Sequence, residues 1–146
     1  MLISLPLLIL VVIVYNVLAL AGPALMGAEF TGMEAFLASG VQFTMFSGDL
    51  WTFTMGDLIV AVGLILLFIE IVKSTRTTAS AIINHGLSML VFIVALVEFI
   101  VLNGFATSVF FMITLMTLLD VVAGFTISIV AAKRDLGVSP GIIGTN

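Results

Sequence analysis

The sequence of 146 residues has no cysteine, a single histidine and few charges of either sign. Only 8% of the residues are charged, whereas a soluble domain carries about 25%. Without cysteine the chain has neither thiol chemistry nor a disulfide scaffold. One histidine is weak evidence for a zinc site, because such sites usually collect several His or Cys ligands. Four Lys or Arg are too few for a nucleic-acid surface. Soluble enzymes, disulfide-stapled domains and nucleic-acid binders are therefore poor interpretations.

Apolar residues are abundant instead, at 62% of the chain, which is more than a water-soluble domain of this length can bury. A membrane-spanning helix needs about 20 mostly apolar residues. Four stretches qualify, namely 2–21, 58–72, 79–102 and 107–132. The sequence therefore predicts an all-α integral membrane protein, a single domain over 1–146 with four transmembrane helices in an up-down bundle.

The basic residues indicate the orientation. With four spans, the loop 73–78 and the tail 133–146 lie on the same side as the N-terminus, and they hold every Lys and Arg. The loop 22–57 has no basic residue and several acidic ones. Because basic residues accumulate on the cytoplasmic side, we expect both termini in the cytoplasm, the loop 22–57 outside, and a bacterial inner membrane as the location. The short connection 103–106 predicts an antiparallel pair of helices.

The loop 22–57 is the only sizeable segment predicted outside the membrane. Thr31 and Glu34 have the spacing of a capping box, and Asp57 is placed to cap the second span. Apolar residues follow at helical spacing, namely Met33, Phe36, Leu37 and Val41. This pattern predicts a short amphipathic helix on the outer membrane surface, followed by aromatic residues that suit the interface. This loop could serve as a lid over the bundle, as a re-entrant segment, or as a contact surface for another subunit.

Three carboxylates fall within the predicted spans, where an ionisable group costs about 2.5 kcal/mol or more. Glu70 precedes Lys73 by three residues, a spacing that allows an ion pair. Glu98 lies near the outer end of the third span, where we expect it to reach the membrane interface, or to pair with Asn103 or with the loop. Asp120 lies in the middle of a long apolar helix, so its short side chain cannot reach water.

Asp120 shares one face of the fourth span with polar and small residues. These are Thr114, Thr117, Gly124 and Ser128. We expect Asp120 to be protonated, or hydrogen-bonded to Thr117, to Asn16 or to a neighbouring chain. Gly124 and Ser128 have the small-xxx-small spacing that permits close helix approach, which predicts that Gly124→Leu breaks an oligomer.

A polar cluster is expected in the inner half of the bundle. Because consecutive spans are antiparallel, Glu70, Asn84 and His85 occupy similar depths, with Asp120 closer to the midplane. Such a cluster could relay protons, since a buried carboxylic acid keeps its proton to higher pH and histidine titrates near neutrality. It could also hold a cation, bind a small ligand, or serve only in helix packing. No metal site and no cofactor are predicted.

The leading hypothesis is a structural or assembly subunit of a homo- or hetero-oligomeric membrane complex. Its partners would be the lipid bilayer and other subunits, without nucleic acid. The alternative is an oligomeric proton or cation channel or transporter that uses the intramembrane carboxylates. An intramembrane enzyme is the third hypothesis, because no nucleophile or metal motif accompanies Glu70, His85 and Asp120.

Overall fold

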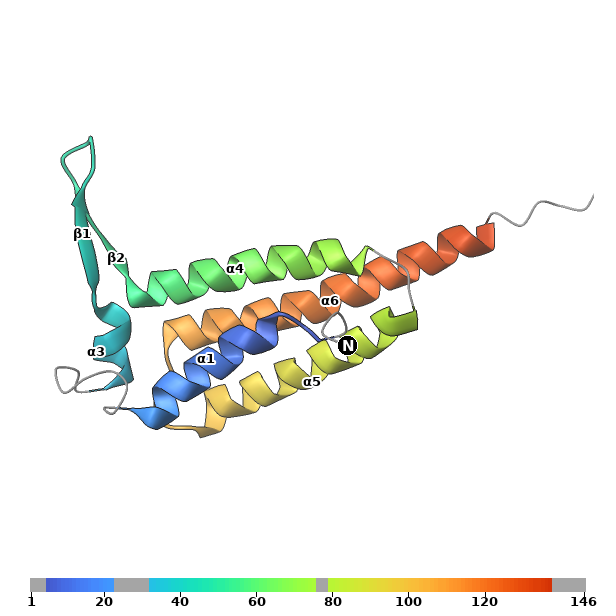
Figure 1. Ribbon diagram of the computed structural model, residues 1–146, viewed down its shortest axis with the longest axis horizontal. Coiled ribbons are helices and arrows are strands. Elements are labelled where there is room, and N and C mark those ends of the chain that lie inside the picture. The colour runs from blue at the N-terminus through green and yellow to red at the C-terminus, as the bar shows by residue number, and fades with distance from the viewer. Residues whose placement is uncertain (1–4, 23–31, 76–78, 138–146) are drawn as a thin grey trace, which may run out of the picture.

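The computed structural model describes residues 5–22, 32–75 and 79–137, and these are mostly helical (Figure 1). The elements in chain order are α1 (Leu8–Ala21), α3 (Met33–Ala38), β1 (Gly40–Thr44), β2 (Leu50–Thr54), α4 (Met55–Ser74), α5 (Ala79–Val101) and α6 (Ser108–Gly137). Helices α4, α5 and α6 lie side by side, and α1 packs along all three. These four helices are called the helical body below.

Three stretches of helix are long and apolar enough to cross a membrane, namely Met55–Ser74, Ile83–Val101 and Ser108–Val130. Their outward side chains are large and apolar, as with Phe68 and Ile100, which are 67% and 71% exposed. Such surfaces suit lipid and not water. The protein is therefore a membrane protein, as the composition indicated.

Helix α1 is shorter than the span expected over 2–21. It has 14 residues and begins at Leu8, so it rises only about 21 Å. Pro6 lies just before it, and the Pro6 carbonyl accepts a bond from Ile9 N–H at 3.2 Å. Proline is tolerated at a helix start but not farther inside a helix, which explains why the helix begins after Pro6. Residues 2–4 of the expected span lie outside the described residues.

Asp57 takes part in capping α4, as expected, but from inside the helix, because α4 begins at Met55 and not at residue 58. Thr54 is the N-cap, and its hydroxyl accepts a hydrogen bond from Asp57 N–H at 3.0 Å. The Asp57 carboxylate accepts in return from Thr54 N–H at 2.9 Å, which completes a capping box. At the same end of the body, α5 and α6 are joined by the short connection that was expected, in which Gly104 turns the chain with φ of 84°.

The loop after residue 22 contains a β-hairpin, so the all-α prediction is wrong there. Strands β1 and β2 pair antiparallel, with Val41 opposite Phe53 and Phe43 opposite Trp51. The helical spacing that extended to Val41 ends at Ala38, because the residues from Gly40 onward alternate between apolar and polar, a period that favours a strand. Gly48 forms the tight turn, with φ of 91°.

The helix expected in this loop exists as α3, but it has only six residues. Its N-cap is Gly32, which has no side chain to accept a capping hydrogen bond. Thr31, the residue expected to cap it, lies outside the described residues. Met33 and Leu37 are buried and pack into the main apolar cluster. Helix α3 is therefore attached to the helical body at one end, which is called the hairpin end below.

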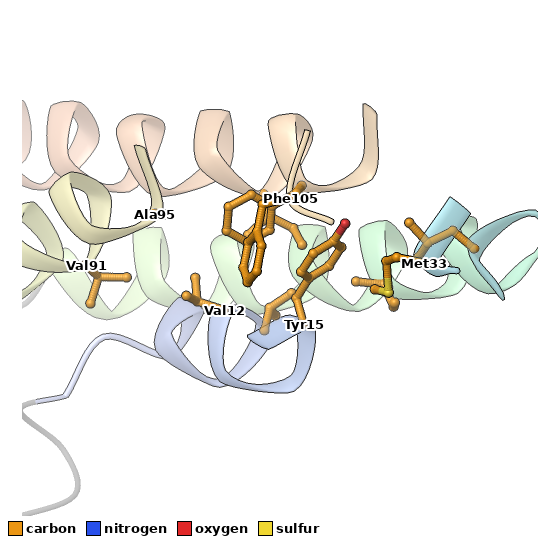
Figure 2. Packing of buried hydrophobic residues seen from close by; sticks show 11 residues of the cluster. Val12, Tyr15, Met33, Val91, Ala95 and Phe105 are labelled. Atoms are coloured by element: carbon orange, nitrogen blue, oxygen red, sulfur yellow. The ribbon is translucent and has the colours of Figure 1, made fainter. Parts of the chain in front are cut away.

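An aromatic cluster closes the hairpin end of the body. Tyr15 of α1, Phe105 and Phe110 are fully buried, with the Tyr15 and Phe110 ring centroids 4.6 Å apart. Figure 2 shows Tyr15 and Phe105 facing each other. The Tyr15 hydroxyl donates to the Gly104 carbonyl at 3.1 Å and lies 2.6 Å from the Thr107 hydroxyl. The cluster fastens α1 to the connection between α5 and α6.

Candidate functional site

A buried ion pair lies toward the end of α4 that is remote from the hairpin. The Lys73 ammonium lies 2.8 Å from Glu70 Oε1, which confirms the pair expected from the three-residue spacing. The Glu70 side chain is fully buried, whereas the Lys73 side chain is 23% exposed. Asn84 of α5 donates to Glu70 Oε1 at 2.6 Å. Glu70 thus joins α4 to α5, at the similar depth expected for these two residues.

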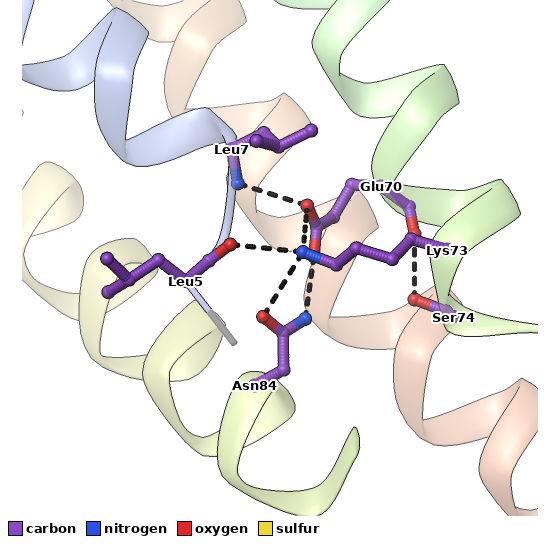
Figure 3. A network of polar contacts seen from close by, with 6 residues as sticks. All are labelled: Leu5, Leu7, Glu70, Lys73, Ser74 and Asn84. Carbon is purple, nitrogen blue, oxygen red and sulfur yellow. Dashed lines mark hydrogen bonds and ion pairs between the residues drawn. The ribbon is translucent and has the colours of Figure 1, made fainter. Parts of the chain in front are cut away.

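The same carboxylate holds the start of α1. Leu7 N–H donates to Glu70 Oε2 at 3.0 Å, and the Lys73 ammonium donates to the Leu5 carbonyl at 3.0 Å. Figure 3 shows the backbone before α1 facing both charged side chains. A helix start leaves unpaired N–H groups and carries partial positive charge. Glu70 therefore caps α1 from another helix, an interaction that the sequence analysis missed.

Asp120 lies nearby on α6 and is almost wholly buried, at 1% exposure. Its Oδ1 has no hydrogen-bond partner in the described part of the chain. Both partners expected for it within the chain are engaged elsewhere. Thr117 donates to the Thr114 carbonyl at 2.7 Å, and Asn16 donates to Val12 and Glu98. Those two expected hydrogen bonds are wrong, because each donor is satisfied by its own surroundings.

His85 and Ser88 of α5 face the same region between α5 and α6. Both are buried, and neither the His85 ring nitrogens nor Ser88 Oγ has a hydrogen-bond partner among the described residues. The Ser88 side chain lies next to the Asp120 carboxylate. The negative charge of Glu70 interacts electrostatically with both His85 and Asp120. His85, Ser88 and Asp120 are called the orphan cluster below. Buried polar atoms without partners are rare in proteins and call for an explanation by water, an ion or chemistry.

The polar face of α6 is turned into the helical body. Thr114, Thr117 and Gly124 are buried and Ser128 is half-buried. Gly124 has no side chain where the His85 ring approaches it, and a Cβ added there would lie 2.6 Å from His85 Cε1. The close approach that the glycine permits is thus made to α5 of the same chain. It is not available as the contact between chains that the Gly124–Ser128 spacing suggested.

Glu98 has a partner different from the one expected. It accepts a hydrogen bond from Asn16 Nδ2 at 2.9 Å, so the contact joins α5 to α1. Asn103, the expected partner, lies in the exposed turn that follows α5. The interhelical hydrogen bond expected of an asparagine in the membrane is present, and Glu98 accepts it.

The charged residues do not form a metal-binding arrangement within residues 5–22, 32–75 and 79–137, where no three His, Asp or Glu side chains converge. Glu70 is satisfied by Lys73, Asn84 and Leu7, whereas His85 and Asp120 are not satisfied. The region therefore has two parts. The bonded network around Glu70 holds three helices together, and the orphan cluster beside it has free donors and acceptors.

The backbone of residues 5–7 belongs to this region and was not singled out by the sequence analysis. Ser88 follows Asn84 by four residues and falls on the polar stripe that the sequence indicates for the third span, but it was not expected beside Asp120. In comparisons with known proteins, no family model, no curated protein and no solved structure matches this chain, so its function has to be inferred from its own residues.

Proposed function

We propose that the chain is a structural or assembly subunit of a homo- or hetero-oligomeric membrane complex. It crosses a bacterial inner membrane four times, with both termini in the cytoplasm and the hairpin outside. Two observations support this topology. Helix α1 runs along the other three helices, and Lys73 and Lys133 lie toward the end of the body remote from the hairpin. Basic residues prefer the cytoplasmic side.

The exposed aromatic face of the hairpin carries the proposal. Because side chains alternate along a strand, Val41, Phe43, Trp51 and Phe53 share one face. The other face is mainly polar, with Gln42 and threonines, and Leu50 is its large apolar residue. Val41 is 62% exposed, and Phe43 and Trp51 are close to half exposed. An exposed apolar patch on a structured element typically marks an interaction surface.

The position of the hairpin favours a neighbouring subunit as its partner. The hairpin extends crosswise to the helices, away from the helical body (Figure 1). Among the residues that the structure describes, it is a sheet of two strands whose outer edges are unpaired, and such edges can pair with another chain. Two-stranded hairpins are marginally stable by themselves. The hairpin gains stability when a second subunit covers its aromatic face.

Substitutions on the two faces of the hairpin test this function. The triple variant Val41→Ser, Phe43→Ser, Trp51→Ser is expected to weaken association by about 30-fold or more, because one buried aromatic contact is worth about 2 kcal/mol. The complex formed by the tagged full-length chain in its native membrane is extracted in mild detergent, and its mass is compared with the 15.5 kDa of one chain.

The matched control changes the opposite face, with Gln42→Ser and Thr52→Ser, and should leave the complex intact. The thermal unfolding of the helical body should be the same in all three proteins, since these side chains are exposed. A parent chain that is monomeric, or a triple variant as large as its control, contradicts the proposal.

Proton or cation passage is the second candidate function, and the orphan cluster is the observation that favours it. A carboxylate, an imidazole and a hydroxyl lie buried between α5 and α6 with free hydrogen-bonding atoms. Groups of these kinds form proton relays in membrane proteins. Because they lie inside one chain, the path would run through each subunit and not along an axis between subunits.

Replacement of Asp120 by Asn tests this second function. The parent protein in vesicles should acidify the lumen when a membrane potential is applied, and Asp120→Asn should reduce the rate at least about 10-fold, since an amide cannot exchange the carboxyl proton. An internal pH-sensitive dye reports the flux. Asp49→Asn, in the exposed hairpin turn, is the control and should retain the parent rate. A parent rate equal to that of empty vesicles rules out proton passage, and the same assay with a dye for Na⁺ or K⁺ decides on cation passage.

A further inference from the structure

A groove on the outside of the helical body runs between α1 and α5. It has a volume of about 630 Å³ and is lined almost entirely by apolar side chains. Those that form its walls include Val12, Ile13, Val17, Leu20, Leu90 and Val94. Asn16 and Glu98 are the polar residues in its lining. The groove is separate from the orphan cluster and from the hairpin.

The length of the groove matches one leaflet of a membrane. Its lining on α1 extends from Ile9 to Ala21, a rise of about 18 Å along a helix. Half of a hydrocarbon core is about 15 Å thick. On α5 the lining lies between Leu90 and Glu98, in the half of that helix nearer the hairpin. With the topology proposed above, the groove therefore follows the outer leaflet, and its surface suits an acyl chain that lies parallel to the helices.

The polar part of the groove holds the carboxylate of Glu98. The Glu98 carboxylate accepts one hydrogen bond from Asn16 and remains partly exposed. The sequence has no Lys or Arg before Lys73 or between 77 and 132, and Lys73 is paired with Glu70. A carboxylate at membrane depth needs a cationic or hydrogen-bonding partner. In the described part of the chain, Glu98 forms no ion pair.

We propose that the groove binds one phospholipid with a primary ammonium headgroup, of the phosphatidylethanolamine type. The acyl chain lies against the apolar walls, and the ammonium donates hydrogen bonds to Glu98. Glu98 precedes the end of α5 by three residues, about one helical turn from the interface where headgroups lie. A primary ammonium can donate to a carboxylate in a charge-assisted hydrogen bond, whereas a trimethylated headgroup has no N–H to donate.

Lipid retention by the full-length protein tests the site. The purified chain is incubated with vesicles of phosphatidylethanolamine, phosphatidylcholine or phosphatidylglycerol that share the same acyl chains, and native mass spectrometry counts the bound lipids. We expect one retained phosphatidylethanolamine per chain, at about 10-fold lower concentration than the other two lipids, the ratio that one charge-assisted bond provides. Equal retention of the three lipids overturns the proposal.

Two variants test separately the contact with the headgroup and the contact of the acyl chain with the apolar walls of the groove. Glu98→Gln should abolish the preference for phosphatidylethanolamine, and Val94→Phe, which fills the wall, should lower retention of that lipid while Glu98 is unchanged. Glu34→Gln, an exposed acid on α3, should behave as the parent. An unchanged preference in Glu98→Gln, or unchanged retention in Val94→Phe, contradicts the site. Competition by free ethanolamine as effective as that by the lipid would show an amine site instead, and would overturn the assignment of a lipid.

Discussion

Replacing Glu70 by Ala is expected to lower the free energy of unfolding by about 3–5 kcal/mol, the cost of leaving one partner of a buried ion pair alone. The Glu70 carboxylate is fully buried and accepts from Lys73, Asn84 and Leu7 N–H at 2.6–3.0 Å. Removing the carboxylate takes the shared acceptor away from the Lys73 ammonium, the Asn84 side-chain amide and Leu7 N–H. The Asn84 amide and Leu7 N–H then lack their acceptor in a place where water is scarce. The Lys73 ammonium loses its counter-ion and keeps only the Leu5 carbonyl and Asn84 Oδ1 as acceptors.

Unfolding in a mild detergent, followed by circular dichroism against increasing denaturant, measures this loss. Glu34→Ala is the matched control, because Glu34 is exposed on α3 and should change stability by no more than about 0.5 kcal/mol. The double variant Glu70→Ala, Lys73→Met removes the stranded charge as well and should regain about half of the loss. If the double variant is no more stable than Glu70→Ala, electrostatics are not the cause.

The same network shows which part of the site sequence reasoning can reach. The Glu70–Lys73 pair follows from a three-residue spacing on one helix, and the depth of Asn84 follows from antiparallel order. The bonds to Leu5 and Leu7 depend on where α1 begins. If the helix began at residue 2, as predicted, the Leu5 carbonyl and Leu7 N–H would form hydrogen bonds within the helix and would need no other partners. Pro6 was the signal that they would need partners elsewhere.

The hairpin escaped prediction for a different reason. Four apolar residues between Met33 and Val41 fit a helical period, and the alternation that marks β1 begins only at Gly40. Two periods that overlap in so short a stretch cannot be separated by spacing alone. The long helices α4, α5 and α6 were predictable because about 20 apolar residues in a row leave few alternatives in lipid.

The partners of Asp120 could not be predicted, because hydrogen bonding between helices depends on how each helix is rotated. Periodicity put Thr117 and Asp120 on one face of α6, and both are buried. The Thr117 hydroxyl is nevertheless satisfied by its own helix, by donation to the Thr114 carbonyl. Threonine in a helix commonly bonds backward in this way. A shared face therefore predicts shared burial, and not a bond.

Gly124→Ala is expected to lower the free energy of unfolding by about 1–3 kcal/mol, the usual cost of an overpacked core. The added Cβ would lie 2.6 Å from His85 Cε1, closer than carbon atoms can approach, so the imidazole ring has to move. The contact joins α5 to α6 within one chain, so the substitution is expected to lower the stability of the fold and to leave the association of subunits unchanged. Chemical unfolding gives the loss, and the mass of the detergent-extracted complex should stay that of the parent.

Gly86→Ala is the matched control, since a Cβ at Gly86 meets nothing within 4 Å. It replaces glycine by alanine at an exposed position of α5, where the better helix former adds at most about 1 kcal/mol of stability. A loss of stability in Gly86→Ala similar to that in Gly124→Ala would point to a general effect of the substitution.

The decisive comparison repeats Gly124→Ala in a chain that already carries His85→Ala. Without the ring the new methyl group has room, so the substitution should then cost no more than about 0.5 kcal/mol, and the two changes should be strongly non-additive. His85 makes no hydrogen bond in the described part of the chain, so its removal breaks none there. A loss of the same size in both backgrounds would mean that the His85 ring does not limit how closely α5 and α6 approach, and that the orphan cluster is looser than its burial indicates.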